Sequence, residues 1–119
     1  MPLSRYARNK LMNSLFDQEV YIALHERNPD AGGAGELSGK SYKRFPAKAL
    51  FSLVSEGQTE LVSSVLFEDL PSAKISHAAL WDSETGGNLL WASEFEKMRE
   101  IEDGDGFKLP AGRFILGLT

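Results

Sequence analysis

The chain has 119 residues, a formal net charge of −4 and no cysteine. This length fits a single domain with one hydrophobic core, and the missing thiols exclude disulfides, cysteine nucleophiles and thiolate metal sites. The acidic balance argues against nucleic acid as the main ligand. No apolar run reaches the roughly 18 residues of a membrane span, and the N-terminus lacks the apolar stretch of a signal peptide. We therefore expect no membrane partner and no secretion.

The charge is unevenly distributed along the chain. Residues 1–48 hold eight basic and five acidic side chains, whereas residues 49–119 hold five basic and twelve acidic ones. Such polarity favours head-to-tail or ring association, because the basic part of one subunit attracts the acidic part of the next. The alternative is a chance distribution of solvated surface charges.

The N-terminal segment, residues 1–18, is predicted to form a helix of about three turns. Ser4 can act as its N-cap, because a serine hydroxyl accepts a hydrogen bond from a backbone N–H of the first turn. The apolar residues recur at helical spacing, with the stripe formed by Ala7, Leu11 and Leu15 and with Met12 and Phe16 beside it.

This helix is too short to be stable alone, so it must dock on its own domain or on a neighbouring subunit. Both alternatives stay open from the sequence. We treat the helix as a docking and attachment element, and its candidate assembly interface consists of Tyr6, Leu11, Leu15 and Phe16.

After the helix, apolar residues recur at alternate positions, which is the periodicity of a strand. Residues 20–25 alternate Val, Ile and Leu with Tyr, Ala and His. Residues 28–41 are rich in Gly, Asp and Ser and form a predicted loop. Residues 45–54 look extended, and Pro46 within them favours an edge strand because proline has no N–H to donate. Residues 61–67 are the next predicted strand.

The clearest local prediction is a hairpin formed by residues 75–81 and 89–95. Its connection, residues 82–88, holds two glycines, which supply the positive φ that a tight hairpin turn needs. Further along, residues 107–109 and 114–118 are predicted to pair with each other.

Short strands with turn signals between them predict a mainly β fold. We expect an antiparallel β-sandwich of jelly-roll or immunoglobulin-like type over residues 19–119, with one N-terminal α-helix. A parallel α/β sheet is excluded because crossover helices have no room. After residue 17 the one helix-like stretch is residues 94–102.

Residues 34–41 read AGELSGKS and satisfy a relaxed phosphate-loop pattern. In a phosphate loop the Lys-Ser pair opens a helix whose N-terminal amides hold phosphate. Here Pro46 follows closely, and it pushes the preceding residue towards extended geometry. Ala34 also replaces the first glycine, so we interpret the segment as a loop without a nucleotide.

The two histidines, His25 and His77, both lie in predicted strands. We place His77 on the same strand face as Ile75, Ala79 and Trp81. No third ligand recurs at metal-site spacing, and no Gly-x-Ser-x-Gly elbow supplies a nucleophile. Structural histidines are therefore favoured, and the sequence predicts no catalytic residue, no metal and no cofactor.

An acidic cluster between residues 94 and 105 raises a calcium hypothesis, because calcium binds several converging carboxylates. The plausible turn is Asp103-Gly104-Asp105-Gly106. Its spacing is not that of an EF-hand loop, and no distal glutamate closes it. A solvated turn is the favoured interpretation.

Several blocks of the chain occur in an order that resembles a known family. They are VYIAL at residues 20–24, NPDAGG at 28–33, ELSG at 36–39, YKR at 42–44, ISHAALWD at 75–82, TGGNLLW at 85–91 and GDGFKLPAG at 104–112. With the N-terminal helix, they resemble short tail-fibre or minor tail proteins of tailed phages and prophages. The resemblance implies a virion structural role, assembly in the host cytoplasm and no catalytic residues to carry over.

The leading hypothesis is a non-enzymatic virion module of the tail fibre or tail, which forms a homo-oligomer and contacts other virion proteins of the tail, neck or capsid. A capsid decoration protein on the phage head is the alternative within that class. A carbohydrate-binding module is the alternative of another class, because Trp81 and Trp91 on the two hairpin arms could form a sugar platform. In that case a host-surface glycan is a further partner.

Overall fold

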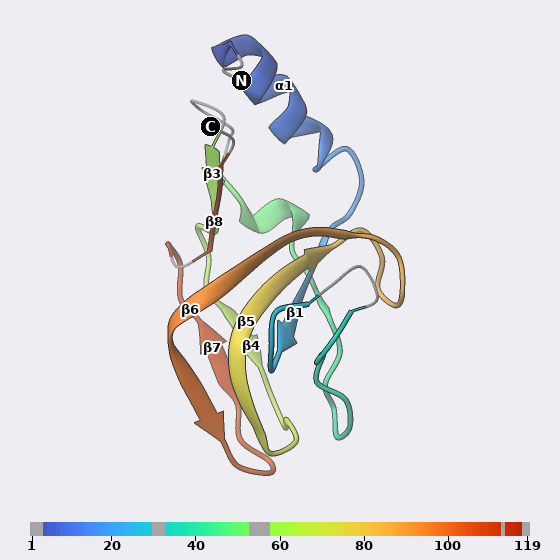
Figure 1. The fold of residues 1–119 in the computed structure, drawn as a ribbon, viewed down its shortest axis with the longest axis vertical. Helices are drawn as coiled ribbons and strands as arrows, with labels where there is room; N and C mark the ends of the chain where they lie inside the picture. Colours follow the sequence, from blue (N-terminus) through green and yellow to red (C-terminus); the bar gives the residue numbers. More distant parts are fainter. Residues whose placement is uncertain (1–3, 30–32, 53–57, 113, 118–119) are drawn as a thin grey trace.

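The fold begins with a helix that is followed by strands. The computed structural model describes residues 4–29, 33–52, 58–112 and 114–117 (Figure 1). Helix α1 (Arg5–Ser14) starts after Ser4, whose hydroxyl accepts a hydrogen bond from the Ala7 N–H at 3.0 Å. The predicted N-cap is therefore confirmed. Within the described ranges, no helix is long and apolar enough to cross a bilayer.

The larger sheet has four antiparallel strands in the order β2-β1-β5-β6. Their bounds are β1 (Tyr21–His25), β2 (Phe45–Pro46), β5 (Ala73–Trp81) and β6 (Leu89–Ile101). The prediction that Pro46 belongs to an edge strand is confirmed, since β2 lies at one edge of this sheet. The predicted extension to residue 54 is wrong, because a 3-10 helix, η1 (Lys48–Leu50), follows β2 directly; residues 53 and 54 lie outside the described residues.

The predicted hairpin is confirmed as β5 and β6. Two glycines of its turn adopt positive φ, +59° at Gly86 and +76° at Gly87. The helix-like reading of residues 94–102 is wrong, because β6 continues as a strand to Ile101. Backbone pairing with the start of β5, where Ala73 is opposite Ile101, overrides the helix preference of these Glu, Lys and Met residues.

A register irregularity in β5, between Ile75 and His77, decides which side chains face the core. Ile75, like Ala78 and Leu80, belongs to the main core cluster, whereas Trp81 packs in a separate cluster on the opposite face of the sheet. The prediction that His77 shares a face with Ile75 is therefore wrong. From Ile75 to His77 the pairing advances two positions in β5 but five in β6. Such an irregularity reverses the alternation, which a strict period of two does not anticipate.

The second layer consists of two antiparallel ladders. They are β3 (Gln58–Glu60) with β8 (Ile115–Gly117), and β4 (Val65–Phe67) with β7 (Phe107–Leu109). Leu61 joins them, because its N–H donates to the Phe114 carbonyl at 2.9 Å and its carbonyl accepts from the Gly112 N–H at 2.7 Å.

The sequence predicted that residues 107–109 and 114–118 pair with each other. These ladders show that this prediction is wrong. At the central pair of each ladder, β7 pairs with residues 42 positions earlier in the chain and β8 with residues 57 positions earlier. The predicted strand at residues 61–67 is divided between Leu61 and β4. The two ladders and Leu61 between them are called the ribbon below.

The core lies between the four-stranded sheet and this ribbon. Ile22, Leu24 and Leu80 of the sheet cluster with Val65 and Leu109 of the ribbon, and all five are at most 2% exposed. Truncating one such leucine to alanine typically costs about 2–5 kcal/mol of stability. The predicted fold class, mainly β and antiparallel with one N-terminal helix, is confirmed, with its second layer divided into two short ladders.

Candidate functional site

Helix α1 lies at one end of an elongated molecule whose principal extents are 46 × 27 × 25 Å (Figure 1). Its own domain buries one side of it. Met12 is 0% exposed, and the half-buried Leu15 and Phe16 pack against the same core. The Phe16 ring lies 5.2 Å from the Phe51 ring, which in turn lies 5.9 Å from Phe114. These contacts hold the helix within its own subunit.

The other side of α1 carries two large exposed apolar side chains. Tyr6 is 73% exposed and Leu11 is 50% exposed. The Lys10 ammonium lies 5.8 Å from the centre of the Tyr6 ring, within the range of a cation–π contact. The predicted interface is thus divided: Tyr6 and Leu11 face outward, whereas Leu15 and Phe16 face the core of the same chain.

A second exposed surface is formed by β6, which is the other edge of the four-stranded sheet. From Glu94 to Glu100 the side chains are exposed, except Phe95. Phe95 stacks on Phe107 of β7 at 5.7 Å and lines a groove of about 280 Å³ between the two strands. A long strand with one unpaired edge is a natural place for another chain to pair.

A buried polar cluster connects the loop after β1 with the β5–β6 turn. Arg44, 6% exposed, forms two parallel hydrogen bonds with Glu36: Nε to Oε2 at 2.9 Å and Nη2 to Oε1 at 2.8 Å. The Tyr42 hydroxyl also donates to Glu36 at 2.7 Å. The remaining nitrogen, Nη1, donates to the carbonyls of Ser83 and Gly86 at 2.9 and 2.8 Å. The guanidinium therefore ties the turn to the loop.

Charge pairing decides the ionisation of this cluster. Burial by itself would raise the pKa of Glu36, but the hydrogen bonds from Arg44 and Tyr42 outweigh it and hold that pKa below its ordinary value. The hydrogen bond to Glu36 raises the pKa of Arg44. Burial, together with donation to Glu36, raises the pKa of Tyr42. The cluster is therefore a fixed ion pair with a neutral phenol, which stabilises a local conformation.

His25 uses both ring nitrogens inside the protein. Nδ1 lies 2.9 Å from the Ala34 carbonyl, and Nε2 lies 3.4 Å from the Trp81 indole nitrogen. An indole N–H can only donate, so Nε2 accepts and the proton is on Nδ1. Burial lowers the pKa of His25. In the part of the chain that the structure describes, no group of three or more His, Cys, Asp or Glu could hold a metal ion.

Trp81 and Trp91 do not form the sugar platform considered above. Trp81 is 2% exposed and is covered by the Arg44 guanidinium, 4.3 Å from its ring centre. Trp91 is half-buried and packs against the main core. The acidic turn is also internally bonded, because Asp105 accepts from the Glu102 N–H at 2.9 Å and Asp103 pairs with Lys40 at 3.0 Å.

The phosphate-loop-like string forms a turn. Lys40 has φ +52°, and Ser41 bonds to Asp69 through both its N–H and its hydroxyl. Glu36 and Arg44 both lie in blocks that carry the family resemblance, but no sequence pattern predicted that they contact each other. Eight positions separate them across a loop, so neither helical nor strand periodicity relates them.

A comparison with protein families adds the context for these surfaces. The family described as "Podophage GP4 fiber I protein gp80" matches residues 2–117 of the chain. The chain belongs to the gp80 family. Membership in the gp80 family shows a phage fibre structural protein and implies a place in the virion. The predicted resemblance to phage tail-fibre proteins is thereby confirmed. No curated protein matches the chain.

Proposed function

We propose that this gp80-family chain is a non-enzymatic module of a tail fibre, which assembles as an oligomer through the exposed side of α1. The observation that carries the proposal is the pair Tyr6 and Leu11, 73% and 50% exposed on a helix whose opposite side is already buried. Burying one large apolar side chain is worth about 1.5–3 kcal/mol, and tyrosine is enriched at interface hot spots. A helix that is docked on one side and exposes two large apolar side chains elsewhere therefore suits a contact with a further protein.

The polar cluster supports a structural role for the rest of the domain. The donors of Arg44 are used by Glu36 and by two turn carbonyls, so none of the contacts described for it is directed at a ligand. Across the residues whose placement is described, no buried side-chain nitrogen or oxygen lacks a partner. Such an arrangement rigidifies a fold, whereas an active site keeps reactive groups available.

The proposed partners are other virion proteins and further copies of the chain, joined to the particle in the host cytoplasm. Within this proposal the fibre or tail is preferred to the head because the matched family is named for a fibre protein. Decoration of the phage head is the competing position.

Incorporation of variants into particles tests this function. We expect Tyr6→Ser combined with Leu11→Ser to reduce incorporation at least tenfold, with the melting temperature of the purified protein unchanged. Leu66→Ser is the matched control, because Leu66 of β4 is 51% exposed, close to the 50% of Leu11. Equal incorporation of both variants would contradict the role of α1. Recovery of the protein in tail-free heads, at a copy number near that of the capsid protein, would support decoration instead.

A further inference from the structure

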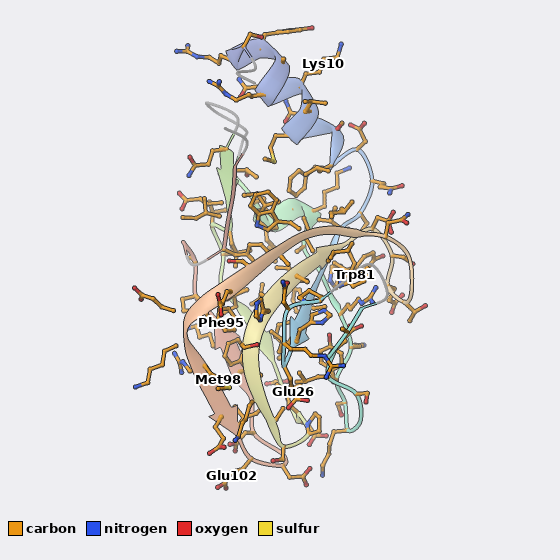
Figure 2. The ribbon with its side chains drawn as sticks, viewed as in Figure 1. Lys10, Glu26, Trp81, Phe95, Met98 and Glu102 are labelled. Carbon is orange, nitrogen blue, oxygen red and sulfur yellow. The ribbon has the colours of Figure 1, made fainter. Side chains whose placement is uncertain are left out.

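A small second core lies on the face of the four-stranded sheet away from the main core. It is formed by Ala23, Ala79 and Trp81, each at most 2% exposed. Trp81 lies where β5 ends and the β5–β6 turn begins (Figure 2). A loop covers this tryptophan, because a Cβ added at Gly33 would lie 3.4 Å from the Trp81 ring. Residues 33–36 of this loop are called the strap below.

The strap is attached to the sheet more lightly than the residue that follows it. The Glu26 N–H, directly after β1, donates to the Gly35 carbonyl of the strap at 2.8 Å. Leu37, 5% exposed within the main core, anchors the end of the strap and donates to the Leu24 carbonyl at 3.1 Å. Short segments with few backbone bonds open at a lower free energy than the whole domain. The strap can therefore lift about Leu37 while the main core stays intact.

His25 lies beneath the strap and joins it to the second core. The ring is 0% exposed; its Nδ1 donates to the Ala34 carbonyl at 2.9 Å, and its Nε2 accepts from the Trp81 indole N–H at 3.4 Å. Both contacts require the neutral imidazole, since a ring with two protons has two donors and no acceptor. A second proton would leave the buried Trp81 N–H facing another donor.

The surroundings of His25 oppose a second proton as long as the strap is closed. Burial lowers the pKa of His25 most strongly, against the opposing effect of the bond to Ala34. Glu36 favours the charged ring, but both of its carboxylate oxygens already bind Arg44. Arg44 and His77, which is opposite His25 on β5, disfavour a further positive charge. An open strap would expose the ring to water, which removes the largest of these penalties.

We propose that His25 acts as an acid-sensitive latch, whose second proton releases the strap from Trp81 while the main core stays folded. Glu36 remains ionised in mild acid, because its pKa is held below the ordinary value of 4.5. Its ion pair with Arg44 therefore persists, and Arg44 leaves the face of Trp81 together with the strap. Opening uncovers the apolar second core, which is closed at neutral pH.

Amide exchange measured by NMR on the full-length protein tests the latch. Below pH 6.5 the open form binds more protons than the closed form, so acid favours opening. Between about pH 7.5 and about pH 5.5 we expect the protection factors of the Glu26 amide and the Trp81 indole N–H to fall several-fold, up to about tenfold. The Leu37 amide, one position beyond the strap, should keep its protection, and so should the Leu61 amide of the ribbon.

Two histidine variants identify the group that titrates. His25→Gln keeps an acceptor for Trp81 and a donor for Ala34 but does not titrate, so its Glu26 amide should be equally protected at both pH values. His77→Gln is the matched control, because it removes the other histidine and should retain the loss of protection.

If His25→Gln fails to fold, titration of the ring nitrogens of His25 in the unmodified protein replaces it. The loss of protection at Glu26 must then follow the titration of His25. Constant protection of the Glu26 amide would overturn the inference. An equal loss at the Leu61 amide would also overturn it, because the whole domain would then be opening.

Discussion

The ion pair of Arg44 and Glu36 illustrates how a single buried charge can organise several loops. Removing one member of a buried pair typically costs about 3–5 kcal/mol, because the other charge is left without compensation. Arg44 avoids that cost with a bidentate contact to Glu36, two turn carbonyls and the face of Trp81. Because its planar fork fits a carboxylate and stacks on an aromatic ring, lysine could not replace it.

His25 predicts a loss of stability in mild acid. Its pKa is lowered in the folded protein, so below its ordinary value of 6.5 the unfolded chain binds more protons. The free energy of unfolding should therefore fall between pH 7 and pH 5, by at most about 1.4 kcal/mol per pH unit. Glu36 also makes the protein less stable in acid, because its pKa is lowered in the folded protein from the ordinary value of 4.5. The stability that Glu36 contributes is lost only below that value, outside the interval in which His25 acts.

Urea unfolding at several pH values measures this effect. His25→Gln keeps an acceptor for the Trp81 indole and a donor for the Ala34 carbonyl but does not titrate, so its stability should change less over the same interval. A wild-type stability that is constant or rises towards pH 5 would contradict the assignment.

At the scale of the element, the β5–β6 turn shows why two adjacent glycines are not equivalent. Asp82 closes the turn, accepting from the Asn88 N–H at 2.7 Å and from its side-chain amide at 2.9 Å. A Cβ on Gly87 would lie 2.5 Å from Asp82 Oδ1 and 2.6 Å from Ser83 Cβ. A Cβ on Gly86 would meet nothing within 4 Å.

Alanine at these two glycines should therefore have different costs. Gly86→Ala should lower the free energy of unfolding by about 1 kcal/mol, because alanine is strained in the left-handed backbone conformation of Gly86. Gly87→Ala adds a clash with the closing aspartate, and we expect a cost of about 2–3 kcal/mol. Thermal unfolding of both variants checks the difference. Equal losses would show that the turn can open without disturbing Asp82.

At the scale of the whole molecule, one core unites the sheet, the ribbon and the end of the helix. Among the described residues, α1 contributes Met12 to the buried core cluster. The other described members of the cluster follow residue 19. The division into a docking helix, residues 1–18, and a β domain, residues 19–119, remains a prediction.

Deletion of residues 1–18 tests that division. We expect the remaining chain to stay folded, with a lower melting temperature, because losing the buried Met12 side chain costs about 2–5 kcal/mol and Phe51 loses its ring contact. Met12→Ala in the full chain should produce much of the same loss. Amide dispersion in NMR spectra and a cooperative melting curve would confirm a folded remainder, whereas their absence would make the helix an inseparable part of the core.

Local patterns were sufficient for the parts of this protein that depend on neighbouring residues. Ser4 as N-cap, the glycine-marked hairpin, the edge position of Pro46 and the order of family blocks were all predictable from the sequence. The N-cap, the hairpin and the edge proline depend on backbone conformation or on hydrogen bonds within a few positions, and these are properties of short segments.

Only the tertiary structure decided the features that depend on distant partners. Three of these features join segments about forty or more positions apart: the pairing of β7 with β4, the pairing of β8 with β3, and the contact of Arg44 with the β5–β6 turn. A fourth is the extension of β6 to Ile101, which depends on its pairing with β5. The same holds for α1, whose apolar residues are divided between the core and an outward face. The periodicity of the sequence shows which apolar residues share a face of a helix or strand. The packing of the whole core decides which of these faces are buried.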